Sequence, residues 1–413
     1  MYSSKVVFAL IASIAVASAL PNLGGIIGGG NNGNEGGLGG IVEGVTGGLT
    51  GGEGGLGGLL GGILGGQGGI GGILEGILGG EGGLGGLLEL VNQPGLETED
   101  HHKAYVKTLE NFIFATEKLG IDGLAKQYRK LDAQLDSSLT FDAFKQNMHK
   151  NRYSDVVCRD STRVKLTIDA SSQGDYIHAN YVRTNYLHNT FICTQGPLQY
   201  TIGDFWRMVF QERAQSILML CRVIEEGRPK CVGYWPSSGE EETHGCIRIK
   251  NLGEANEEFE IVNLLVTFIP DGVPLNEQPA DKTELRVNLI KWPNWPDRGV
   301  PDEKCHTVPQ RLLAQVRQGP CVVHCSAGIG RTGCVVALEF AYTRLNKEMK
   351  VDFEEIAMEL RKQRAQCIQT EIQYLYIHRV MIAFARGEAE ISEKAAASAD
   401  AFLKSYDDHL KRN

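Results

Sequence analysis

The glycines of this chain are concentrated toward its N-terminus, and this limits where a compact fold can form. Of the 52 glycines among 413 residues, 35 precede residue 96. Glycine pairs recur every three or four residues between Gly24 and Leu88, and each glycine costs about 1 kcal/mol in a helix. We therefore expect residues 20–100 to be a disordered, weakly self-associating low-complexity segment and linker. The alternative is a glycine-faced helix that packs on copies of itself. In either case residues 101–390 remain for one large core.

The first nineteen residues have the features of a secretory signal peptide. Lys5 precedes an apolar run over residues 6–16, and Ala17-Ser18-Ala19 has the small-x-small pattern of a cleavage site. We expect residues 1–19 to direct secretion. The alternative is a short hydrophobic N-terminus on a cytoplasmic protein. No later run of eighteen apolar residues occurs, so the sequence predicts no transmembrane anchor.

Between residues 101 and 390, short apolar runs alternate with amphipathic stretches, which is typical of an α/β domain. The expected strands cover residues 217–220, 246–249, 259–268, 285–290 and 321–324. The expected helices cover residues 104–118, 204–213, 331–345, 352–364 and 371–385. Residues 391–413 are expected to be a C-terminal helix or tail, because Phe402, Leu403, Tyr406 and Leu410 follow helical spacing.

A cysteine and an arginine, Cys325 and Arg331, bracket the loop between an expected strand and an expected helix. The residues between them are Ser326, Ala327, Gly328, Ile329 and Gly330. A thiol at a helix N-terminus has a lowered pKa, because the helix dipole and unpaired N–H groups favour the thiolate. The loop N–H groups can turn inward around an anion, and the planar arginine fork suits two phosphoryl oxygens. The spacing predicts a site that holds phosphate against a sulfur nucleophile.

The longer string from His324 to Gly333, His-Cys-Ser-Ala-Gly-Ile-Gly-Arg-Thr-Gly, resembles the signature loop of the cysteine-dependent protein tyrosine phosphatases. It is most similar to the phosphotyrosine-selective branch, and motifs of that family follow in order from about residue 101 to about residue 387. The resemblance implies one catalytic domain of the non-transmembrane type, built on a twisted mixed β-sheet flanked by helices. It also implies hydrolysis through a phosphocysteine on Cys325, with Arg331 binding the phosphate and with no metal ion or cofactor.

The resemblance extends to a general acid. Asp297 lies 28 residues before Cys325 in Trp295-Pro296-Asp297, which is similar to the family's mobile acid loop. It implies that Asp297 protonates the leaving phenol and later activates water, while Trp295 anchors the loop and Pro296 limits its backbone. Taken alone, Pro-Asp followed by Arg-Gly would be an ordinary surface turn.

Further motifs imply supporting roles. Gln369 and Gln373 would position the hydrolytic water, and Thr332 would hydrogen-bond the departing thiolate. His324 would lie behind the nucleophile, and Glu225 and Lys230 would contact Arg331 and Asp297, respectively.

Selectivity would come from the segment Lys150 to Val156, which resembles the family's substrate loop. Tyr153 would stack on the substrate ring and deepen the pocket, and Asp155 would hold the peptide backbone. The implied partners are phosphotyrosine-containing proteins or peptides.

Two positions depart from the family pattern. His178 stands where the family usually has asparagine, in a segment that supports the phosphate loop from behind. Glu226 stands where a lysine or a similar second-site residue often follows Glu225, so we do not predict a second phosphotyrosine pocket.

The net charge and the distribution of cysteines limit which partners and which cellular compartment we expect. The net charge of −9 indicates no general basic patch, so nucleic acid is not an expected partner. The ten cysteines are scattered, which indicates neither a zinc site nor a disulfide framework. The absence of a disulfide framework conflicts with secretion, because an oxidising compartment would oxidise a cysteine of low pKa. The ten are Cys158, Cys193, Cys221, Cys231, Cys246, Cys305, Cys321, Cys325, Cys334 and Cys367.

Three functional hypotheses result. The first is a secreted protein tyrosine phosphatase. The second is a secreted phosphotyrosine-binding or structural protein with an inactive phosphatase fold, against which the intact set of Cys325, Arg331 and Asp297 counts. The third is a phosphatase of dual specificity, against which the pocket-deepening Tyr153 counts.

Overall fold

The computed structural model describes residues 99–134, 136–187, 189–256, 259–269, 283–301, 306–316, 319–387 and 390–412. These residues belong to one compact unit. The expected signal peptide, residues 1–19, and the expected glycine-rich segment up to residue 98 lie outside the described residues. Within the described ranges, no helix combines the length and apolar character that crossing a membrane requires.

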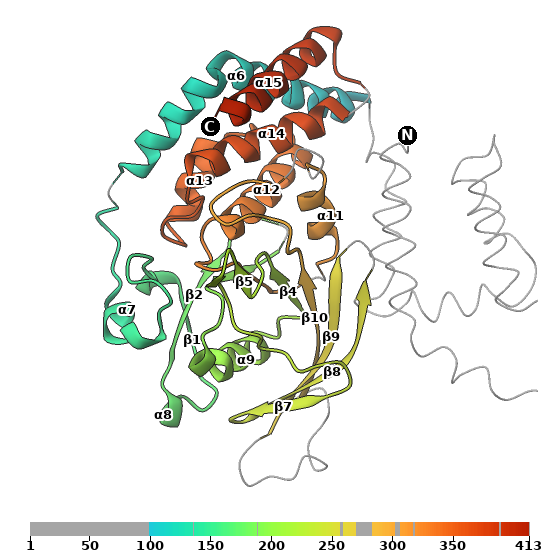
Figure 1. The fold of residues 1–413 in the computed structure, drawn as a ribbon. Helices are drawn as coiled ribbons and strands as arrows, with labels where there is room; N and C mark the ends of the chain where they lie inside the picture. Colours follow the sequence, from blue (N-terminus) through green and yellow to red (C-terminus); the bar gives the residue numbers. More distant parts are fainter. Residues whose placement is uncertain are drawn as a thin grey trace, which may run out of the picture. The chain divides into compact units, whose positions relative to one another are not determined.

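A nine-stranded mixed sheet forms the centre of the unit (Figure 1). Strand β11 lies in its middle and pairs in parallel with β3 and β4, and β4 pairs in parallel with β10. The remaining neighbours are antiparallel. The order across the sheet is β1 (Arg163–Lys165), β2 (Tyr176–Val182), β3 (Phe191–Thr194), β11 (Cys321–His324), β4 (Ser216–Met219), β10 (Glu284–Lys291), β9 (Glu260–Phe268), β8 (Ile247–Asn256) and β7 (Glu241–His244). A separate hairpin consists of β5 (Ile224–Glu225) and β6 (Arg228–Pro229).

Helices flank this sheet. Helix α12 (Arg331–Asn346) packs on β11 and β3, and α11 (Val308–Ala314), α13 (Phe353–Arg361) and α14 (Glu371–Gly387) pack around it. Helices α6 (Glu99–Asp132) and α15 (Glu393–Arg412) pack on α14 and on each other. Helix α9 (Ile202–Gln211) lies on the side of the sheet away from this layer (Figure 1). The short elements are α7 (Asp142–Gln146), α8 (Ala170–Gln173) and 3₁₀ turns at Met148–Lys150, Asp160–Thr162 and Gln199–Thr201.

The predicted fold class, a twisted mixed sheet flanked by helices, is confirmed. The expected strand 321–324 matches β11, and most other expected strands and helices agree with the structure to within a few residues. The expected strand 246–249 covers only the start of β8, which continues to Asn256. The expected helix 104–118 is only the first part of α6, which resumes after a break at Gly120, where φ is 60°. The strands β1, β2, β3, β5, β6 and β7 and the helices α7, α8 and α11 were not anticipated. Helix α15 occupies the C-terminal region for which a helix or tail was expected.

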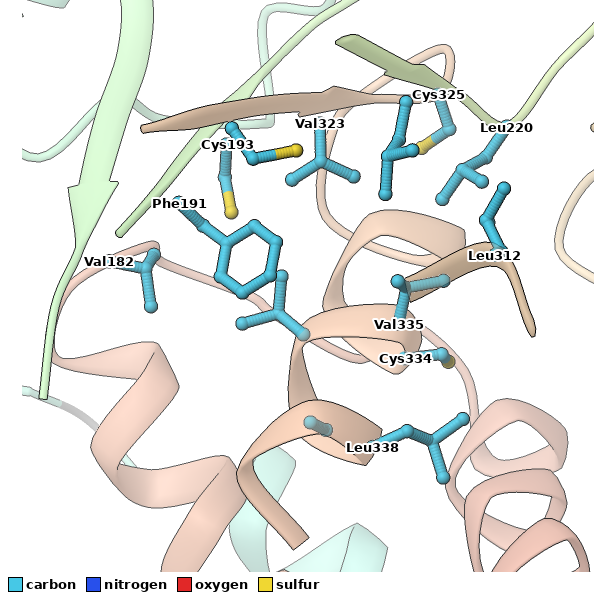
Figure 2. Packing of buried hydrophobic residues seen from close by; sticks show 14 of the residues in the cluster. Val182, Phe191, Cys193, Leu220, Leu312, Val323, Cys325, Cys334, Val335 and Leu338 are labelled. Carbon is cyan, nitrogen blue, oxygen red and sulfur yellow. The ribbon is translucent and has the colours of Figure 1, made fainter. Parts of the chain in front are cut away.

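The hydrophobic core anchors both ends of the phosphate loop, the segment from Cys325 to Gly330. Val322 and Val323 of β11 are fully buried, and β11 is paired on both edges. Side chains of the strands, such as Phe191, face Val335 and Leu338 of α12 (Figure 2). Because burying such side chains contributes roughly 1.5–3 kcal/mol each, the strand and the helix are firmly joined. The loop from Cys325 to Gly330 therefore spans two anchored ends.

Candidate active site

The loop between β11 and α12 surrounds the Cys325 sulfur. Cys325 is 3% exposed, and the Gly328 N–H points at its Sγ at 3.3 Å. Gly328 has φ of +71°, and a Cβ there would lie 2.0 Å from the carbonyl oxygen of Thr194. Only glycine fits this position, since the backbone angle and the space both exclude a side chain.

The electrostatics around Cys325 favour a thiolate. Burial acts to raise the pKa of the Cys325 thiol, but the charge of Arg331 and hydrogen bonds from Thr332 and Gly328 outweigh it, so this pKa is lowered. The pKa is instead raised for six other cysteines, by burial in five of them and, in Cys221, by its hydrogen bond with Cys231 and then by burial. These are Cys158, Cys193, Cys221, Cys321, Cys334 and Cys367.

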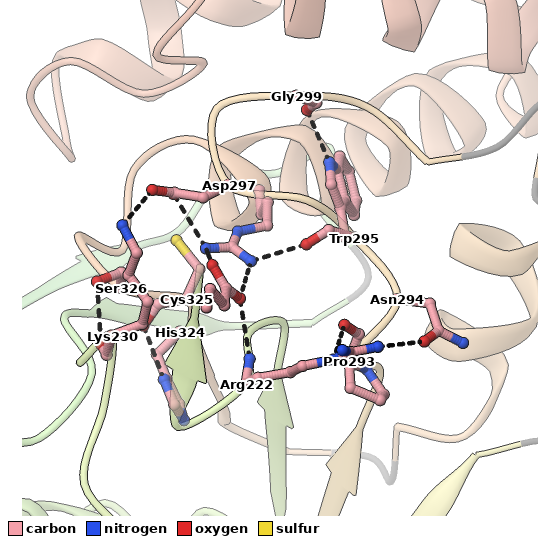
Figure 3. Close-up of polar contacts among 12 residues, drawn as sticks. Arg222, Lys230, Pro293, Asn294, Trp295, Asp297, Gly299, His324, Cys325 and Ser326 are labelled. Carbon is pink, nitrogen blue, oxygen red and sulfur yellow. Dashed lines mark hydrogen bonds and ion pairs between the residues drawn. The ribbon is translucent and has the colours of Figure 1, made fainter. Parts of the chain in front are cut away.

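Arg331, the first residue of α12, is held in one orientation by three residues from outside the helix. Its two terminal nitrogens donate to the two carboxylate oxygens of Glu225 at 2.6 and 3.0 Å. They also donate to the Trp295 carbonyl at 2.8 Å and to Asp297 Oδ1 at 3.1 Å (Figure 3). The guanidinium is buried, and its charge lies beside the sulfur.

The acid loop is folded against this arginine. Asp297 forms ion pairs with Lys230 and Arg331 (Figure 3). Burial acts to raise the pKa of Asp297, but the Lys230 hydrogen bond and the charge of Arg331 prevail and lower it. The indole of Trp295 is buried and donates to the Gly299 carbonyl at 3.0 Å. It packs edge-on against Tyr376, with ring centroids 5.1 Å apart. The Asp297 carboxyl group therefore lies beside the Arg331 guanidinium.

Both expected glutamines lie over the phosphate loop. A Cβ on Gly330 would lie 2.9 Å from Gln373 Oε1 and 3.1 Å from Gln369 Oε1. Thr370, between them in sequence, donates from its hydroxyl to the Arg298 carbonyl at 3.2 Å. The glutamine segment thus contacts both the phosphate loop and the acid loop.

The expected substrate loop forms one wall of the site. Ser326 donates from its hydroxyl to the Lys230 carbonyl at 2.9 Å, so the Tyr153 hydroxyl is the donor in its 2.8 Å bond to Ser326. Val156 packs with Ala327 and Ile329 of the phosphate loop. Asp155, on the same wall, is exposed.

Three residues of the site were not anticipated. Arg222 donates to the Pro293 carbonyl at 3.1 Å and to the Asn294 side chain at 3.2 Å, which ties the β5–β6 hairpin to the start of the acid loop. Tyr234 donates from its hydroxyl to Nε2 of His324 at 2.8 Å. The Nδ1–H of His324 in turn donates to the Cys325 carbonyl at 3.1 Å.

The third unanticipated residue is Arg364, in the segment between α13 and α14. It is fully buried and donates to the backbone carbonyls of Gly328 and Ala327, at 3.0 Å each. Nothing in the sequence distinguishes Arg364 from a surface arginine, because its carbonyl partners lie 36 and 37 residues away.

Comparisons with known proteins point to one family. The family model described as "Protein-tyrosine phosphatase" matches residues 147–383. The receptor-type tyrosine-protein phosphatases F of Bos taurus and Homo sapiens are each 36% identical over 63% of this chain. The chain spans only 14% of the length of these relatives.

Solved structures show the same similarity. The catalytic domain of human protein tyrosine phosphatase non-receptor type 18 is 32% identical with a TM-score of 0.56, covering 63% of this chain and 96% of that one. PTPN18 in complex with HER2-pY1196 phosphopeptides is 30% identical with a TM-score of 0.59. The match covers 68% of this chain and 99% of that chain.

Proposed function

This chain belongs to the protein-tyrosine phosphatase family, and from that premise we propose that it hydrolyses phosphotyrosine in proteins or peptides through a phosphocysteine on Cys325. The proposal depends on one observation, which is that three chemical groups lie close together. A thiol of lowered pKa, a buried guanidinium and a carboxyl group lie around one loop whose N–H groups suit an anion. The PTPN18 complexes with phosphotyrosine peptides support the same substrate class.

In the first step, the Cys325 thiolate attacks phosphorus and the bond to the tyrosine oxygen breaks. Arg331 and the loop N–H groups hold the phosphoryl oxygens, while Asp297 gives its proton to the departing phenolate oxygen. The pKa of Asp297 is lowered by Lys230 and Arg331 in the free protein. A bound phosphate dianion adds negative charge beside this carboxyl group, which favours its protonated form.

In the second step, water attacks phosphorus and the bond to sulfur breaks, which releases inorganic phosphate and restores the thiolate. Asp297 takes the water proton. The side chains of Gln369 and Gln373 reach the loop at Gly330, which supports their role in positioning this water. Thr332 stabilises the thiolate that leaves.

The wall formed by Tyr153 supports selection of phosphotyrosine. Its phenol is hydrogen-bonded to the edge of the phosphate loop, so the wall keeps a fixed height above the sulfur. A long aryl phosphate reaches Cys325 over such a wall, whereas phosphoserine does not. This favours phosphotyrosine selectivity over dual specificity.

We also propose that the protein is secreted. The support is the sequence of residues 1–19, which lie outside the described residues. In this segment Lys5 precedes the apolar run 6–16, and small residues come before Leu20. The domain limits 1–19, 20–100, 101–390 and 391–413 remain predictions, as does self-association through the glycine-rich segment.

One experiment tests activity and export together. The full chain with its native N-terminus is expressed in secretory cells, and the medium is assayed for release of phosphate from a phosphotyrosine peptide. Cys325→Ser is the matched control. We expect Cys325-dependent activity in the medium. Activity confined to the lysate would contradict secretion, and normal peptide binding without turnover would favour the phosphotyrosine-binding alternative.

A further inference from the structure

We propose that His178 is a positioning residue that joins the substrate loop to the phosphate loop and thereby sets the depth of the phosphotyrosine pocket. The inference rests on the proposed function, and it concerns a position where the family usually has asparagine. His178 lies on β2, has 2% exposure and does not reach the substrate itself.

The contacts of His178 define a single neutral tautomer. Nε2 lies 2.8 Å from the Val156 carbonyl oxygen, which only accepts, so Nε2 carries the proton. Nδ1 lies 3.2 Å from Arg364 Nη1, which only donates, so Nδ1 is the acceptor. Burial, followed by the charge of Arg364, lowers the pKa of His178 to about 3, so the imidazole stays neutral near pH 7.

On its Nδ1 side, His178 reaches the phosphate loop through Arg364. The same guanidinium donates to the carbonyls of Gly328 and Ala327, at 3.0 Å each, and to Asn180 Oδ1 at 2.8 Å. Turning these carbonyls outward leaves the loop N–H groups free to face the anion. Because other acceptors also hold Arg364, this side of the link has partial support from elsewhere.

On its Nε2 side, His178 gives the substrate loop a second attachment, besides the bond between Tyr153 and Ser326. Val156, whose carbonyl accepts the bond, packs against Ala327 and Ile329 and lies three residues after Tyr153. The imidazole is itself fixed by the Phe144 ring, at 5.8 Å between centroids in an edge-on arrangement. The imidazole therefore links the Val156 carbonyl to Arg364, which in turn binds the loop carbonyls of Gly328 and Ala327.

Substitution of His178 by asparagine or glutamine distinguishes the contact made by Nδ1 from the contact made by Nε2. Asparagine places an amide near the Nδ1 position and can still accept from Arg364, but it has no group near Nε2. Glutamine places an N–H near the Nε2 position and can still donate to Val156. We therefore expect His178→Asn to release the substrate loop and His178→Gln to retain it.

The test measures binding in the Cys325→Ser background, so that it does not depend on turnover. Dissociation constants are measured for a phosphotyrosine peptide and for inorganic phosphate, with His178→Asn, His178→Gln and His378→Asn. His378 is the matched control, because it is equally buried and is also bonded to a backbone carbonyl, that of Tyr374 at 2.8 Å. Melting temperatures of all variants are recorded alongside.

The expected result is a loss confined to the peptide. His178→Asn should weaken peptide binding about tenfold, the worth of one buried hydrogen bond, with phosphate binding unchanged. His178→Gln should restore peptide affinity to within about twofold, and His378→Asn should change neither constant. Unchanged peptide affinity in His178→Asn, equal weakening of both ligands, or no rescue by glutamine would overturn the proposal.

Discussion

The guanidinium of Arg331 and the carboxylate of Glu225 form a two-pronged ion pair, with donor–acceptor distances of 2.6 and 3.0 Å. The two residues are 106 positions apart in sequence. A planar fork matched by two oxygens cannot rotate freely, so the pair fixes the orientation of the Arg331 guanidinium.

Removing Glu225 should therefore lower activity. Glu225→Ala leaves a buried guanidinium without its orienting partner, and we expect kcat/KM on a phosphotyrosine peptide to fall roughly 10–100-fold. The neighbouring Glu226→Ala, at an exposed position of the same hairpin, is the control and should stay within about twofold of the unmutated enzyme. Similar losses in both variants would argue against an orienting role.

Cys325 should react with a thiol reagent at lower pH than the other cysteines. Its pKa is lowered, whereas burial raises the pKa of neighbours such as Cys193 and Cys334. Because alkylation needs the thiolate, iodoacetate at pH 6 should label Cys325 first. Peptide mass spectrometry would locate the label, and excess inorganic phosphate should protect the site. A pattern in which Cys193 or Cys334 is labelled before Cys325 is incompatible with this assignment.

Gly328→Ala should disrupt the phosphate loop. The new methyl group would lie 2.0 Å from the Thr194 carbonyl oxygen, and φ of +71° disfavours any side chain. We expect a lower melting temperature and loss of turnover. Gly227→Ala, also at positive φ but with nothing within 4 Å of the added carbon, isolates the backbone effect and should be milder. Melting temperature and kcat are measured for both variants. Equal effects in the two variants would contradict the steric role of Gly328.

Buried neutral histidines should make stability fall in acid. Burial lowers the pKa of His378 to about 4, whereas a histidine in an unfolded chain titrates near 6.5. Between about pH 6.5 and 4 the unfolded state binds more protons, so the free energy of unfolding decreases as the pH falls.

His378→Asn keeps a donor for the Tyr374 carbonyl and removes the titrating ring. Urea unfolding at pH 7 and pH 4.5 should show that this variant loses less stability on acidification than the unmutated protein. The comparison at pH 7 controls for lost packing against Phe353, whose ring centroid is 4.8 Å from that of His378. Parallel losses in the two proteins would mean that His378 does not titrate in this window.

Sequence patterns predicted the two elements that flank Cys325, but they missed the strands β1, β2 and β3 on one side of β11. β11 and α12 are recognisable because a short apolar run and an apolar helix are separated by a glycine-containing loop. β2 was missed because its polar residues His178 and Asn180 are buried, so its pattern does not alternate. Their burial is compensated by Arg364 and Val156, which come from other parts of the chain.

The positions of Cys325 and Arg331 were predicted from residue type and local spacing, whereas Asp297 was identified only through the family resemblance. The tertiary structure decided what state these groups are in. Their pKa values depend on burial and on charges that distant segments bring near, such as Lys230 beside Asp297 and Glu225 beside Arg331. The link from His178 through Arg364 to the phosphate loop joins residues 186 positions apart, and only folding brings a buried imidazole and a buried guanidinium within hydrogen-bond distance.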